Sequence, residues 1–128
     1  MKKAKPERRG TAFWIERDGG QGREVWLVER PGTGMLGGMR ALPDDGWTAR
    51  RDGSGEPPFA AGWENLGAVR HVFTHAALTL EVRGASGCEA HDGNGRWWPI
   101  DSIEDAGLPT LFAKAARLAL ARDERTVD

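Results

Sequence analysis

Residues 69–75, VRHVFTH, lead directly into residues 76–82, AALTLEV. The second segment alternates apolar and polar residues, which is typical of a β-strand with one buried face. The first segment has the character of another strand, and no Gly or Pro separates the two. If the strands pair antiparallel, Phe73-Thr74-His75 is the exposed tip of a hairpin. The tip carries a ring that can stack and polar groups that can form hydrogen bonds, so we expect it to contact a ligand.

Further strands and one helix are predicted around this hairpin. Apolar runs within residues 11–16 and 24–30 flank a Gly-rich connection, which predicts a second hairpin whose strands are covered on both faces. Residues 96–100 predict a short strand. From Pro109 to about Arg122 apolar residues recur at helical spacing, which predicts an amphipathic helix lying on the sheet. The fold class is therefore α/β (α+β), a mixed β-sheet with a flanking helix or helices.

The connections also carry local signals. Residues 44–61 are rich in Gly, Pro and charge, which predicts an irregular loop. The sequence DGNG at residues 92–95 favours a reversal of the chain. Residues 101–104, DSIE, have the spacing of a capping box, so we expect them to open a one-turn helix that Gly107 closes.

Composition and charge restrict the class of protein. The 128 residues form one domain, which we divide into a basic linker at 1–10, the domain proper at 11–122 and a polar tail at 123–128. The net charge of -1 is unlike that of proteins that bind nucleic acid tightly on their own, so any such binding should be weak or local. The single cysteine, Cys88, excludes an internal disulfide and favours a reducing, cytoplasmic location. No apolar run follows the basic N-terminus, so we expect neither a signal peptide nor a membrane span.

Several short motifs, taken in order, resemble a known family. They are residues 5–10 (KPERRG), 29–31 (ERP) with 34–39 (GMLGGM) and Pro43, 70–75 (RHVFTH), and 98–100 (WPI) with 107–111 (GLPTL). Together they resemble the C-terminal domain of adenine DNA glycosylases of the MutY type, over about residues 5 to 120. The resemblance implies a Nudix-like fold. It also implies a role in recognising 8-oxoguanine opposite the adenine that the enzyme removes.

The same resemblance implies that the isolated chain is not catalytic. A glycosylase of this type needs a helical catalytic domain with a helix-hairpin-helix and a four-cysteine iron-sulfur cluster, which one cysteine and one terminal helix do not supply. We therefore expect an N-terminal glycosylase domain in cis, which would hold the cluster, and no cofactor or metal in this chain. The expected ligand is double-stranded DNA containing 8-oxoG:A, bound by a monomer.

Two other functions remain open at this point. A Nudix hydrolase of the MutT kind, acting on oxidised nucleoside triphosphates, needs several carboxylates on one helix to hold magnesium. The signature Arg-Glu-x-x-Glu-Glu is missing here, and the only glutamate between Pro31 and Trp63 is Glu56. Many glycosylases of the MutY type carry a helix in the segment between Pro31 and Trp63. The packing on that side of the sheet is therefore left open. The other alternative is an inactive Nudix-like scaffold that binds protein or free nucleotide.

The resemblance assigns a chemical role to the tip. 8-Oxoguanine has an N–H donor at N7 and a carbonyl at the adjacent carbon, where guanine has only the N7 acceptor. The Thr74 hydroxyl can accept from that N–H, but it can also rotate and donate, so a backbone carbonyl at the tip should supply much of the selectivity. Phe73 is the candidate to stack on or between bases, with packing into the core as the alternative.

The remaining candidates are basic. His75 and Arg70 are placed to meet phosphate, which fixes the register of the protein on DNA without reading the sequence. His71 is either a ligand or a buried, satisfied histidine. Arg40 is a further candidate for a phosphate contact, and exposed solubilising charge is its alternative role.

Overall fold

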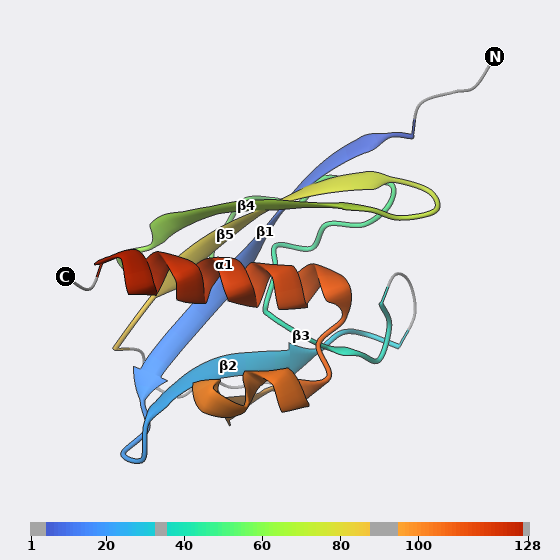
Figure 1. Cartoon of the computed structure of the whole chain (residues 1–128). Coiled ribbons are helices and arrows are strands. Elements are labelled where there is room, and N and C mark those ends of the chain that lie inside the picture. The colour runs from blue at the N-terminus through green and yellow to red at the C-terminus, as the bar shows by residue number, and fades with distance from the viewer. Residues whose placement is uncertain (1–4, 33–35, 88–94, 127–128) are drawn as a thin grey trace.

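The computed structural model describes residues 5–32, 36–87 and 95–126. A mixed sheet is covered on one face by a long C-terminal helix (Figure 1). The elements are β1 (Glu7–Asp18), β2 (Arg23–Glu29), β3 (Arg40–Ala41), β4 (Glu64–Val72), β5 (Ala77–Ala85), β6 (Gly95–Pro99), the 3₁₀ helix η1 (Ile100–Ala106) and α1 (Thr110–Thr126).

The six strands form one sheet in the order β3-β2-β1-β5-β4, with β6 also paired to β2. β1 runs parallel to β5, from Glu7 opposite Ala77 to Ile15 opposite Ala85. All other strand pairs are antiparallel, including β4 with β5 and β1 with β2. The structure confirms the expected mixed sheet with flanking helices, including both predicted hairpins.

Both faces of the central strands are covered, as their consecutive apolar residues predict. On one face, α1 packs mainly against β4 and buries the residues that recur at helical spacing, among them Leu111, Phe112, Ala115 and Ala119. On the other face, Phe13, Ile15 and Trp26 form a second cluster. The partly buried side chains packed against it include Phe59, Trp63 and Trp97, none of which lies in a helix.

Three boundaries differ from the predicted ones. Residues 7–10, expected in the linker, are the first part of β1, because their backbone pairs with β5. The backbone of α1 continues to Thr126, into the expected polar tail. The expected capping box is wrong: Asp101 lies inside the first turn of η1, and no side chain caps that helix. Gly107 does close η1, with a left-handed φ of 72°.

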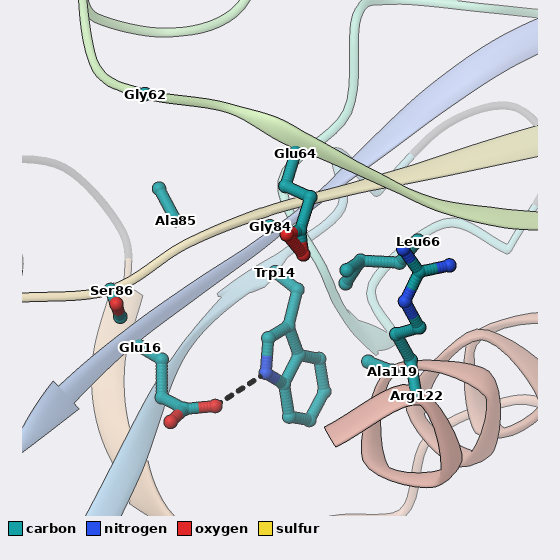
Figure 2. Close-up of a pocket in the computed structure, with 10 residues that line it drawn as sticks. All are labelled: Trp14, Glu16, Gly62, Glu64, Leu66, Gly84, Ala85, Ser86, Ala119 and Arg122. Carbon is teal, nitrogen blue, oxygen red and sulfur yellow. Dashed lines mark hydrogen bonds between the residues drawn. The ribbon is translucent and has the colours of Figure 1, made fainter. Parts of the chain in front are cut away.

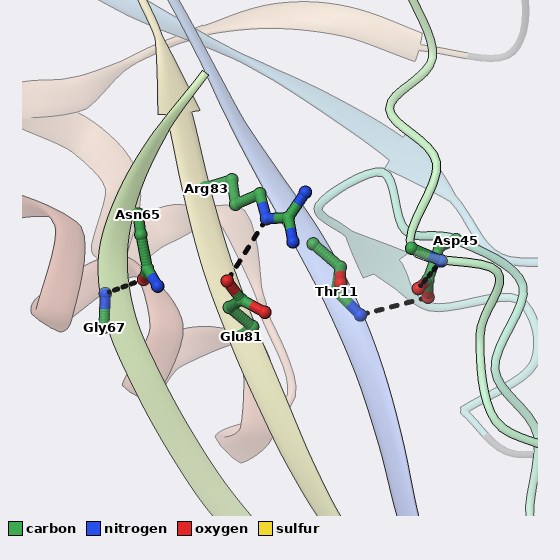
Figure 3. A network of polar contacts seen from close by, with 7 residues as sticks. Thr11, Asp45, Asn65, Gly67, Glu81 and Arg83 are labelled. Atoms are coloured by element: carbon green, nitrogen blue, oxygen red, sulfur yellow. Dashed lines mark hydrogen bonds and ion pairs between the residues drawn. The ribbon is translucent and has the colours of Figure 1, made fainter.

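The segment 44–61 is irregular, as predicted, but it is fastened to β1. Asp45 accepts hydrogen bonds from the backbone N–H groups of Thr11 (3.0 Å) and Gly55 (2.8 Å), the first of which Figure 3 shows. The Gly53 N–H donates to the Arg9 carbonyl at 2.9 Å. The segment therefore lies along the first half of β1, beyond the short stretch where β1 pairs with β2. Cys88 and residues 92–94 of the predicted turn lie outside the described residues.

Candidate functional site

The tip of the β4–β5 hairpin is the connection formed by residues 73–76. Val72 pairs with Ala77, and the Phe73 N–H donates to the Ala76 carbonyl at 2.8 Å. Ala76 is buried, whereas Thr74 and His75 are exposed. In Figure 1 this turn projects beyond the first turn of α1. The turn thus presents a hydroxyl and an imidazole to solvent, at the place where the sequence predicts an exposed tip.

Phe73 lies half-buried beneath this turn. Its ring packs against the core, with its centroid 6.1 Å from that of Trp47 and 4.7 Å from that of His71. The prediction of an outward phenyl ring is therefore only partly met. The ring supports the turn from below, and its stacking on a base stays a prediction.

His71 lies between Phe73 and the first turns of α1. Its Nδ1 is 3.3 Å from the ammonium of Lys114, which also donates to the Arg70 carbonyl at 3.2 Å. Burial, and then the charge of Lys114, lower the pKa of His71 below its ordinary value of 6.5. A neutral imidazole with Nδ1 as the acceptor fits this geometry. Of the two interpretations of His71, the contacts favour a supported histidine over a ligand.

Residues at and just before the start of β1 add charge beside the tip. They belong to the segment that the sequence predicted to be a linker. The Lys5 ammonium donates to the Phe73 carbonyl at 2.8 Å. Arg70 forms an ion pair with Glu7 at 2.9 Å, and both side chains are more than half exposed. Such an exposed pair adds little stability. Arg70 can therefore exchange its carboxylate partner for a phosphate at small cost.

Arg40 does not join this group. It lies on β3, at the opposite end of the strand order from β4. Its Nη1 donates to the Ala106 carbonyl at 2.7 Å, and its guanidinium lies 4.6 Å from the centroid of the Trp98 ring. The side chain thus holds η1 against the sheet.

Trp47 is the residue near the tip that the sequence analysis missed. It is 1% exposed, and the Arg30 guanidinium lies 4.5 Å from the centroid of its ring. Arg30 also forms an ion pair with Asp44, whose pKa is raised by burial. The sequence does contain a signal that could have identified Trp47, because it is a large apolar residue in a stretch otherwise rich in Gly, Pro and charge. The contacts of its ring connect the Arg30 turn to Phe73.

A hollow of about 790 Å³ lies beside Trp47. It brings together the turn after β2 and the first part of the 44–61 segment. Its lining includes Arg30, Pro43, Asp44, Trp47, Thr48 and Arg50.

A second hollow, of about 250 Å³, lies away from the tip (Figure 2). It is formed where β4 begins and β5 ends, next to the last turns of α1. Within it the Trp14 indole donates to Glu16 at 2.8 Å, and Glu16 also pairs with Arg23 at 2.6 Å. The Trp14 indole and the Glu16 carboxylate thus have protein partners, and none of the sequence-predicted site residues lines the hollow.

The described part of the chain is residues 5–32, 36–87 and 95–126. Within them no three His, Cys, Asp or Glu side chains are grouped as they would be to hold a metal ion. In that part of the chain, no helix has the length and apolar character needed to cross a membrane.

Comparisons with known proteins agree with the fold. Human adenine DNA glycosylase is 26% identical over 121 residues, which cover 81% of this chain and 22% of the length of the human protein. The C-terminal domain of mouse MUTYH, solved in complex with human PCNA, superposes with a TM-score of 0.70 and 21% identity, covering 91% of this chain and 88% of that domain. The MutT protein of Methanosarcina mazei Go1 superposes with a TM-score of 0.67 and 15% identity, covering 99% and 100%.

The family comparison covers most of the chain. The model of the NUDIX domain matches residues 11–118, which include most of β1, all the other strands and about the first half of α1. The chain belongs to the NUDIX domain family.

Proposed function

We propose that this chain is the 8-oxoguanine-recognition domain of an adenine DNA glycosylase. It binds double-stranded DNA that contains 8-oxoG:A, as a monomer that works in cis with an N-terminal glycosylase domain. The observation that carries the proposal is the exposed Thr74-His75 turn, in a chain 26% identical to human adenine DNA glycosylase. Catalysis, and any iron-sulfur cluster, belong to the other domain, and this chain needs no cofactor of its own.

The chemistry of the turn suits an oxidised purine. The lesion offers an N7–H donor and a carbonyl oxygen, so its reader needs an acceptor toward N7. The Thr74 hydroxyl supplies an acceptor, and a backbone carbonyl of the turn supplies one that cannot rotate into a donor. Guanine, which has a bare N7, would leave that carbonyl facing an acceptor, at a cost on the order of 1 to 3 kcal/mol.

Magnesium-dependent hydrolysis fits the residues less well. The segment in which a hydrolase of the MutT kind places its metal-binding helix is irregular here. Its aspartates are already engaged: Asp44 by Arg30, Asp45 by the N–H groups of Thr11 and Gly55, and Asp52 by the Arg9 N–H. These carboxylates serve separate partners and do not converge on one point that a divalent cation could occupy. These carboxylates therefore do not fit a magnesium site, and the proposed function includes no hydrolytic step.

The test is a titration of the chain with two matched duplexes, one with 8-oxoG:A and one with G:A, followed by fluorescence anisotropy. We expect the wild-type chain to bind the lesion duplex several-fold more tightly, since one hydrogen bond of about 1 kcal/mol corresponds to roughly a fivefold ratio. Thr74→Ala is expected to reduce that ratio without unfolding the protein.

Thr110→Ala is the matched control, because Thr110 is also exposed but lies at the start of α1. It should leave the ratio at its wild-type value. Equal affinity of the wild-type chain for both duplexes would refute the proposal. Magnesium-dependent phosphate release from 8-oxo-dGTP would support the hydrolase instead.

A further inference from the structure

Three cations from two parts of the sequence, the residues around the start of β1 and the 44–61 segment, lie at the end of the molecule that holds the hairpin tip. Lys5 donates to the Phe73 carbonyl at 2.8 Å, and the Arg8 Nε donates to the Ala49 carbonyl at 3.0 Å. Arg50 follows directly and is exposed. Because β1 begins opposite the start of β5, its first residues lie at the same end of the molecule as the tip (Figure 1). We call Lys5, Arg8 and Arg50 the basic patch.

The charges of the basic patch are not neutralised by carboxylates of the described residues. Among the described residues, no carboxylate forms an ion pair with any of the three. Lys5 and Arg8 donate to backbone carbonyls, which are neutral.

The neighbouring acidic residues have other partners. Glu7 pairs with Arg70, and Asp44 pairs with Arg30. Asp45 and Asp52 accept hydrogen bonds from backbone N–H groups of β1. Asp45 and Asp52 keep their negative charges in these bonds, so the three cations of the basic patch exceed the two carboxylates by one charge, in a chain whose net charge is only -1.

From this arrangement we infer that the basic patch is a contact surface for the phosphate backbone of duplex DNA. The inference rests on the proposed function, because it extends the same interface from the tip onto β1 and the 44–61 segment. Side chains that meet phosphate add affinity and fix the register, but they carry no sequence information. The patch therefore sets how tightly the chain binds, and the tip sets which base it prefers.

The experiment compares two double variants of the full chain by anisotropy, over a range of salt concentrations, with the 8-oxoG:A and G:A duplexes. Arg8→Gln/Arg50→Gln removes two charges from the patch. Arg117→Gln/Arg122→Gln removes two exposed charges from α1, outside the patch, and is the matched control. Circular dichroism and thermal unfolding verify that both variants fold, and Arg8→Lys keeps the charge at that position.

Each lost phosphate contact is expected to reduce the slope of log K against log salt by about 0.9, and affinity roughly fivefold to tenfold at about 0.1 M salt. The patch variant should thus lose about two units of slope and bind both duplexes equally less well. The control variant and Arg8→Lys should keep the wild-type slope. An unchanged slope in the patch variant, an equal loss in the control, or no binding of either duplex by the wild-type chain would overturn the inference. A wild-type chain without lesion preference but with the predicted slope changes would refute only the proposed function.

Discussion

At the scale of single residues, the tip depends on side chains that do not face the ligand. Phe73 lies between the rings of Trp47 and His71, and His71 in turn faces the Lys114 ammonium. A turn whose inner residues are packed in this way holds Thr74 and His75 in one place. Such support reduces the conformational entropy that the turn loses when it binds.

The lowered pKa of His71 makes this support dependent on pH. The folded state disfavours the imidazolium, so as pH falls through the ordinary value of 6.5 the unfolded state takes up a proton first. Stability is therefore lost below that pH, and the loss levels off below the pKa of the folded state. Lys114→Met removes the facing charge, so we expect the pKa of His71 to rise and the acid-induced loss of Tm to shrink. An NMR titration of the histidine ring protons measures the pKa directly.

Arg117→Met is the control for that titration, since it removes a cation one turn further along α1. It should leave the pKa of His71 unchanged. If Lys114→Met also left the pKa unchanged, the Lys114 charge would not contribute to the shift, and burial alone would be its cause.

At the scale of elements, β1 and the 44–61 segment form one unit. Asp45 and Gly53 bond to the backbone of β1, and Trp47 lies over Gly10, where a side chain would not fit. A Cβ at Gly10 would lie 2.5 Å from the Trp47 Cδ1 atom. The absence of a side chain at Gly10 thus makes room for the indole that supports Phe73.

Gly10→Ala is therefore expected to destabilise the fold by about 1 to 3 kcal/mol, through overpacking against Trp47. Gly62→Ala is the control, because a Cβ there meets nothing within 4 Å, and it should change stability by less than about 0.5 kcal/mol. Urea unfolding followed by tryptophan fluorescence measures both. Equal midpoints for the two variants would contradict the packing described here.

The sequence predicts the elements well and the supports of the site poorly. Apolar runs and helical spacing reveal β2, β5 and α1 because these elements bury apolar side chains, consecutively in β2 and at regular spacing in β5 and α1. The first residues of β1 leave no such pattern, because they are held by backbone pairing and polar contacts and not by apolar side chains. The path of the 44–61 segment depends on hydrogen bonds such as that of Asp45, which composition does not reveal. Trp47 and Lys114 reach the tip from distant segments, so only the structure places them there.

At the scale of the whole molecule, a nearly neutral chain concentrates positive charge at one end. That end holds the hairpin tip, the start of β1 and the turn around Arg50, whereas the hollow of Figure 2 lies elsewhere. A local patch of this kind is consistent with weak binding by this chain alone, and the glycosylase domain that we propose to act in cis would raise its effective concentration at the DNA.

The central claim is that the tip contacts the lesion, and amide chemical shifts measured during titration with duplex DNA test it most directly. We predict that the amides of residues 73–75 shift most with the 8-oxoG:A duplex and differ from their shifts with G:A. The amides of Lys5, Arg8 and Arg50 should shift alike with both duplexes. Identical shifts at residues 73–75 with the two duplexes, or shifts centred on Trp14 and Glu16, would contradict the account.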